Sequence, residues 1–164
     1  MVQMREDRLQ FSIFEKKTNM YNGLLHAHSG FRWIALLLLL FAIFNAFRSQ
    51  TSGNYLKKDK MINLFAMIML HIQLLIGLVL YFISPKVKFE GEWIGDAIYR
   101  FYGLEHLIGM LLAIVIITFG RKKAENLKST RDKHRRVMIS YGIGLIIILL
   151  SIPWPFRDLG GAWF

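Results

Sequence analysis

Four of the five histidines in this chain lie inside strongly apolar stretches, where a group that can bind metal or carry a proton is costly to bury. His26 and His28 stand two residues apart in HAHSGFRW, at the start of one apolar run. His71 and His106 lie in two later runs. Imidazole nitrogens bind haem iron, copper, zinc and non-haem iron, and they also relay protons. These four residues are therefore candidates for binding a metal or haem iron, or for relaying protons, inside the protein.

The chain contains no cysteine. This excludes disulfides, iron–sulfur clusters bound by cysteine, c-type haem attachment and thiolate zinc sites. Any redox centre held by this chain must therefore use histidine, methionine or oxygen ligands.

Hydropathy predicts the helices that must position the histidines. The chain has 164 residues, of which 54% are hydrophobic, and its mean hydropathy of +0.38 exceeds that of an ordinary soluble domain. The excess falls into four blocks, residues 21–47, 61–84, 97–120 and 137–153. Each is close to the ~20 residues that cross ~30 Å of hydrocarbon. The sequence therefore predicts an all-α, multi-pass membrane protein with a bundle of four transmembrane helices.

One transmembrane domain and a short N-terminal leader are expected. Residues 20–164 would form a single four-helix transmembrane domain. Residues 1–19 mix charges of both signs and lack the apolar core of a signal peptide. They are predicted to be a peripheral or disordered leader.

The net charge of +10 is concentrated in two connections between helices. One follows the first span, and the other, RKKAENLKSTRDKHRR, follows the third. The positive-inside rule places both on the cytoplasmic side of a bacterial inner membrane, which gives an up-down-up-down bundle with both termini on the outer side. Membrane lipid is therefore an expected partner, and nucleic acid is not, because no aromatic residues interleave with the basic run.

Depth in the membrane separates the four candidate histidines. With a rise of about 1.5 Å per residue, His26 and His28 lie roughly 8–10 Å below the outer boundary, and His106 roughly 9–15 Å. His71 lies deeper, about 20 Å below Pro85. The first and third spans run parallel in such a bundle, with room for a flat cofactor between them. This geometry predicts one haem b, with one axial imidazole from His28 or His26 and the other from His106.

Helical geometry allows only one of the neighbouring histidines to bind the iron. Residues two apart point about 200° apart on a helix. Gly23 and Gly30 share a face with His26 and favour that residue. Depth favours His28, and so does Arg32, which shares its face and could reach a haem propionate. His28 and His106 are thus the preferred iron ligands, with His26 and His71 as alternatives.

Three further polar residues are candidates for quinol or proton handling. Glu105 adjoins His106, and Arg100 lies five residues before Glu105. Gln73, two residues after His71, would form a deeper polar site with it. His71 itself could bind a deeper haem, relay protons or join a metal site. His134, in KHRR, is expected to face the cytoplasm as one more basic residue.

The chain resembles a family of small four-helix membrane proteins of Bacteroidota that are labelled "cytochrome B". The resemblance covers most of residues 20–164 and is carried by the stretches YNGLLHAHSGFRW, HIQLLIGLVLYFISP, GLEH, KHRR and SIPWPFR. It implies haem binding and electron transfer. The chain is also similar in plan to four-helix di-haem quinol cytochromes, but its fourth span has no mid-membrane histidine. A second bis-histidine haem is therefore not expected.

The leading hypothesis is a membrane b-type cytochrome that transfers single electrons. Quinol is the expected donor, and a redox partner protein, a respiratory complex or a small oxidant is the acceptor. The sequence leaves open whether the protein is an enzyme. One alternative is a cluster of His26, His28, His71 and His106 that binds copper, iron or zinc without porphyrin. The other is a non-catalytic accessory subunit of a respiratory or export complex.

Overall fold

The computed structural model describes residues 2–51, 53–161 and 163, and the side chains among them from residue 5 onward. This part of the chain contains helices and no strand. Four helices are long and apolar enough to cross a membrane. The prediction of an all-α fold with four candidate membrane spans is therefore confirmed.

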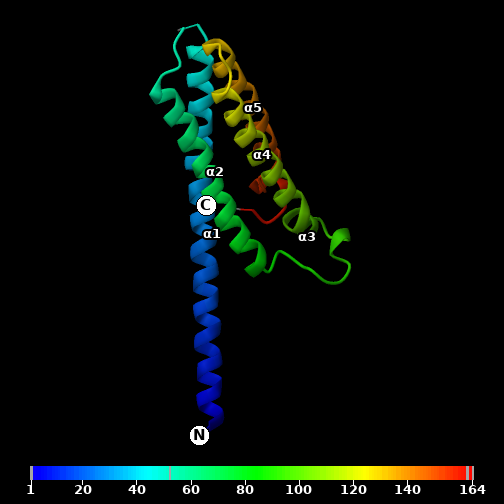
Figure 1. Cartoon of the computed structure of the whole chain (residues 1–164). Coiled ribbons are helices and arrows are strands. Elements are labelled where there is room, and N and C mark those ends of the chain that lie inside the picture. The colour runs from blue at the N-terminus through cyan, green and yellow to red at the C-terminus, as the bar shows by residue number, and fades with distance from the viewer. Residues whose placement is uncertain (1, 52, 162, 164) are drawn as a thin grey trace.

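The first long helix, α1 (Val2–Ser49), is continuous with the predicted leader. It begins at Val2 rather than near Tyr21, because no proline or glycine interrupts the chain before Gly23. Residues 5–20 are exposed, and Figure 1 shows this part of α1 extending well beyond the other helices. Whether the leader lies on the membrane stays a prediction.

The second helix, α2 (Lys57–Ile83), is fixed at its start by a buried carboxylate. Asp59 accepts hydrogen bonds from the main-chain N–H of Leu56 at 2.7 Å and from Asn45 Nδ2 of α1 at 2.8 Å. The first bond caps the helix, and the second ties it to α1. The helix ends before the Ser84–Pro85 pair, as the sequence predicts.

The third span is built from three consecutive pieces: α3 (Ala97–Arg100), the π-helical turn η2 (Phe101–Glu105) and α4 (His106–Glu125). Asp96 caps α3 by accepting hydrogen bonds from two main-chain N–H groups. The carbonyl of Gly103, inside the π turn, accepts a hydrogen bond from Tyr81 Oη of α2 at 3.0 Å. Such turns are rare and frequently occur at functional sites. Here the turn ends directly before His106.

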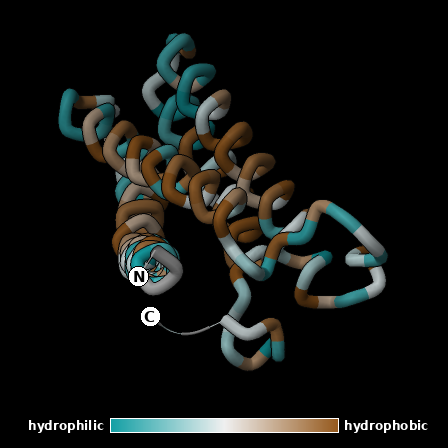
Figure 2. Tube along the Cα trace, turned by 90° about the horizontal axis from the view of Figure 1, so that it is seen from below, coloured by the Kyte–Doolittle hydropathy of each residue, from teal (hydrophilic) through white to brown (hydrophobic). Residues whose placement is uncertain are grey.

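The fourth span is α5 (Thr130–Ser151), which packs along α4. Helix α1 packs against both α2 and α5, whereas α2 and α4 touch only lightly. Figure 1 shows the α1–α2 and α4–α5 connections at one end, with α2 and α4 diverging toward the other. Apolar residues line the middle of the helices and polar residues their ends (Figure 2).

A buried polar network joins the helices at the end that holds both basic connections. Tyr55 Oη donates to Glu125 Oε1 at 3.0 Å, and Asn63 Nδ2 donates to Tyr55 Oη at 3.2 Å. Tyr141 Oη, fully buried on α5, donates to the carbonyl of Asn63 at 2.7 Å. We call Tyr55, Asn63, Glu125 and Tyr141 the basic-end network.

The expectation that His134 faces the cytoplasm is wrong. Its side chain is fully buried, its ring packs against Tyr55 with centroids 5.0 Å apart, and Nε2–H donates to the carbonyl of Asn54 at 3.0 Å. The chain after α1 folds over α5 and covers the imidazole. A charge pattern in the sequence does not reveal this tertiary contact.

Candidate functional site

A cavity of about 200 Å³ lies between α1, α2, α4 and α5, in the half of the bundle away from the basic connections. Its walls are mostly apolar, and leucine is the commonest lining residue. Four of the predicted site residues line it: His28, Arg32, Gln73 and His106. The structure therefore brings together candidates from three of the four spans.

His28 and His106 face each other across this cavity. They come from α1 and α4, two helices that are not packed directly against one another. Their ring centroids lie 6.4 Å apart, and the ring planes are nearly perpendicular, at 74°. Two imidazoles from opposite walls of an apolar cavity can bind one ion or cofactor iron between them.

The orientation of His106 follows from the prolines after α5. The carbonyl of Ser151 would accept from the N–H four residues later in a continued helix, but that residue is Pro155 and has no N–H. His106 Nδ1 lies 2.7 Å from this carbonyl. Because a carbonyl only accepts, Nδ1 carries the proton and Nε2 keeps its lone pair. Metal-binding histidines typically donate their other N–H to such a carbonyl.

His28 is positioned by α2. Gly77 lies against its ring: a Cβ at Gly77 would be 3.2 Å from His28 Cε1. Gln73, one turn earlier, donates from Nε2 to the main-chain carbonyl of His28 at 3.0 Å. Within the described residues, His28 Nδ1 and Gln73 Oε1 are buried without a hydrogen-bond partner. Unpaired buried polar atoms are uncommon, and two on one cavity wall indicate space for a polar ligand.

The residues of the cavity fit a b-type haem. His28 and His106 could supply two imidazoles to the iron, and the apolar walls suit a porphyrin edge. Arg32 and Lys86 add two cations to the lining, which suits the two propionates.

His26 and His71 do not line the cavity. His26 is exposed on α1, because a spacing of two residues turns it away from His28. His71 Nδ1–H donates to the carbonyl of Met67 in its own helix at 2.9 Å. In the part of the chain that the structure describes, no three histidine, aspartate or glutamate side chains gather as a metal site. The four-histidine cluster therefore gains no support.

Glu105 and Arg100 form an ion pair away from the cavity. Arg100 Nε lies 2.8 Å from Glu105 Oε1, and both side chains are more than 40% exposed. Arg100 also donates to the carbonyl of Ile94. The π turn separates this pair from the face that carries His106.

Sequence reasoning missed several residues of the cavity. Lys86, Tyr81 and Ser84 line it, although the sequence analysis gave none of them a role at the site. Tyr102 also lines it. Its spacing of four residues from His106 is the signal that could have found it. The other residues come together through the turn after α2, which has no motif of its own.

The small residues also play other roles than expected. Gly23 and Gly30, which favoured His26, have no neighbour that a Cβ would meet. Gly109 lies against Ser151 of α5 and lets α4 and α5 approach closely. Gly77 is the glycine that adjoins a candidate ligand.

Comparison with known proteins found no matching family model, no matching curated protein and no matching solved structure.

Proposed function

We propose that this chain is a membrane b-type cytochrome that transfers single electrons, with quinol as the electron donor. One observation carries the proposal: His28 and His106 face each other across an apolar cavity, with ring centroids 6.4 Å apart. The resemblance to the "cytochrome B" proteins of Bacteroidota supports the same function.

Each residue of the site has a defined part in holding the cofactor. His28 and His106 bind the haem iron through ring nitrogens, and the Ser151 carbonyl keeps His106 in the tautomer with a free Nε2. Arg32 balances propionate charge. When bound, haem supplies a reversible one-electron change at its iron. The surrounding leucines and isoleucines exclude water and stabilise the porphyrin edge.

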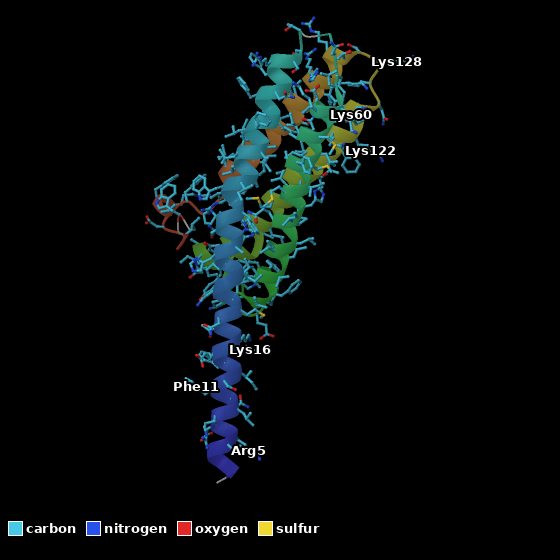
Figure 3. All side chains as sticks on the ribbon, turned by 90° about the vertical axis from the view of Figure 1, so that its left-hand side faces the viewer. Arg5, Phe11, Lys16, Lys60, Lys122 and Lys128 are labelled. Atoms are coloured by element: carbon cyan, nitrogen blue, oxygen red, sulfur yellow. The ribbon has the colours of Figure 1, made fainter. Side chains whose placement is uncertain are left out.

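The proposed orientation is up-down-up-down, with both termini on the outer side of a bacterial inner membrane. Lys60, Lys122 and Lys128 lie at one end of the molecule, opposite Arg5 and Lys16 (Figure 3). A surplus of lysine and arginine at the cytoplasmic end is the general rule for inner-membrane proteins. The cavity then lies in the outer half of the bilayer.

Quinol would approach from the membrane, where α2 and α4 diverge. Gln73 Oε1, buried without a partner among the described residues, offers an acceptor for a quinol hydroxyl proton. The exposed Glu105–Arg100 pair would carry protons toward the outer surface. A redox partner protein, a respiratory complex or a small oxidant would accept the electron.

The test is an absorption spectrum of the purified protein, oxidised and then reduced, with haem and metal analysis of the same sample. The proposal predicts a sharp b-type α band and one haem per chain. A colourless protein without metal would instead support an accessory subunit. Stoichiometric metal without porphyrin would support a histidine metal site.

A further inference from the structure

Two cationic side chains line the cavity near the C-terminal tail. Arg32 comes from α1, and Lys86 from the turn that follows α2. Each holds a main-chain carbonyl of the tail: Arg32 donates to Trp163 at 2.8 Å, and Lys86 Nζ donates to Gly160. Two cations from separate segments of the chain thus meet oxygen acceptors at one rim of the cavity.

The tail reaches this rim by folding back over it. Gly160 and Gly161 line the cavity, and Leu159 is buried. Asp158 and Gly160 have positive φ angles of 53° and 64°, which turn the chain. Trp163 stacks on Trp33 with ring centroids 6.3 Å apart. The carbonyls at the two cations are therefore placed by a turned segment of backbone, and they mark where an oxygen ligand sits.

Aromatic rings hold both cations in place. The Arg32 guanidinium lies 5.3 Å from the ring centre of Trp33, and Lys86 Nζ lies 4.9 Å from that of Tyr102. Lys86 is half-buried, and this burial lowers the pKa of its ammonium group. In the described part of the chain no carboxylate forms an ion pair with Lys86. A carboxylate ligand would compensate the cost of its burial.

We propose that Arg32 and Lys86 together form a two-point carboxylate site, which binds the two propionates of the haem. This inference rests on the proposed function, because it takes the haem between His28 and His106 as given. It assigns Lys86 a role in cofactor binding that its position in the sequence does not suggest. A carboxylate is a stronger acceptor for each cation than the neutral carbonyl it holds in the structure.

The experiment is a titration of the full-length protein, purified from haem-deficient cells, with haemin and with haemin dimethyl ester. The ester keeps the iron and the porphyrin but has no carboxylate charges. Wild-type protein should bind haemin at least about tenfold more tightly than the ester, since a hydrogen bond to a charged group contributes on this scale. Lys86→Gln and Arg32→Gln should each weaken haemin binding about tenfold and leave ester binding nearly unchanged.

Matched controls separate charge from folding. Lys88→Gln removes a lysine from the same connection that does not line the cavity and lies over Tyr99. It should bind haemin as the wild type does. Lys86→Arg keeps the cation and should retain most of the affinity. If Lys86→Gln did not fold, the wild-type preference for haemin over its ester would still show whether the site binds carboxylates.

The outcomes distinguish this inference from the proposed function. Equal binding of haemin and its ester by the wild type would overturn the carboxylate site and leave the cytochrome proposal intact. Unchanged haemin affinity in both Lys86→Gln and Arg32→Gln would likewise overturn the carboxylate site and leave the cytochrome proposal intact. Failure of the wild type to bind either compound would overturn the proposed function, and the inference with it.

Discussion

The imidazole of His106 donates through Nδ1 to the main-chain carbonyl of Ser151, 2.7 Å away on the neighbouring helix. That carbonyl is available because α5 ends at Ser151 and Pro155 cannot continue the hydrogen-bond ladder. The bond fixes the tautomer and the direction of the ring. The prolines that follow α5 thereby orient His106, a candidate ligand on α4.

His28→Ala and His106→Ala should each lower the haem content and convert any haem that remains to the high-spin form, because a single axial imidazole holds the iron less tightly than two. His26→Ala and His71→Ala are matched controls, since neither residue lines the cavity. The measurement is the ratio of haem to protein after purification. Loss of haem in a control, with retention in His28→Ala or His106→Ala, would contradict the ligand assignment.

Gly77→Val should reduce haem occupancy by shifting His28. Even a Cβ at this position would lie 3.2 Å from the imidazole, and the larger side chain costs about 1–3 kcal/mol where it cannot be accommodated. If the whole cost opposes haem binding, the affinity falls roughly fivefold to 140-fold. Gly142→Val is the control, because no atom lies within 4 Å of a Cβ there. Equal haem occupancy in the two variants would show that Gly77 does not position His28.

The basic-end network predicts a loss of stability at alkaline pH. Burial raises the pKa of Tyr55 from its ordinary value of about 10 to about 12, with a further contribution from the charge of Glu125. Between these values the folded protein keeps a proton that the unfolded chain loses. The stability that protonated Tyr55 contributes is fully present below pH about 10. The free energy of unfolding should therefore fall as pH rises from about 10 to about 12.

Thermal unfolding in detergent at a series of pH values tests this prediction. Tyr55→Phe should cost about 1 kcal/mol at neutral pH, since it removes the hydrogen bonds to Glu125 and Asn63. It should also remove the part of the alkaline fall that Tyr55 causes. An identical pH profile in wild type and variant would show that Tyr55 does not titrate in this window.

The absence of cysteine makes the orientation simple to test. Lys16→Cys and Lys128→Cys each introduce a single thiol, at opposite ends of the molecule (Figure 3). A membrane-impermeant maleimide should label Lys16→Cys in spheroplasts and should reach Lys128→Cys only after the membrane is broken. The reverse pattern would invert the proposed topology and place the cavity in the cytoplasmic half.

Much of the fold could be predicted because it follows from local composition. Four apolar runs of membrane-spanning length indicate four helices, and the rise per residue already places His28 and His106 at similar depth. The structure places these two residues, with Arg32 and Gln73, on one cavity. Periodicity on single helices is enough to find His28, Arg32 and His106. The sequence places Gln73 in a deeper site with His71, but Gln73 lines this cavity and His71 does not.

The remaining features depend on contacts between segments distant in sequence. Lys86 reaches the cavity through a turn, and the tail meets it there by folding back. His134 is buried by the connection after α1. The π turn before His106 interrupts the regular helix of the third span, and no sequence pattern indicates it. None of these contacts leaves a periodic signal.

The most direct test of the central claim is low-temperature electron paramagnetic resonance of the oxidised, purified protein, with haem content measured on the same sample. One haem held by His28 and His106 predicts a low-spin ferric signal from one haem per chain. The signal should be lost or become high-spin in His106→Ala and stay unchanged in His71→Ala. A high-spin signal in the wild type, or a low-spin signal that survives His106→Ala, would contradict the assignment of His28 and His106 as the axial pair.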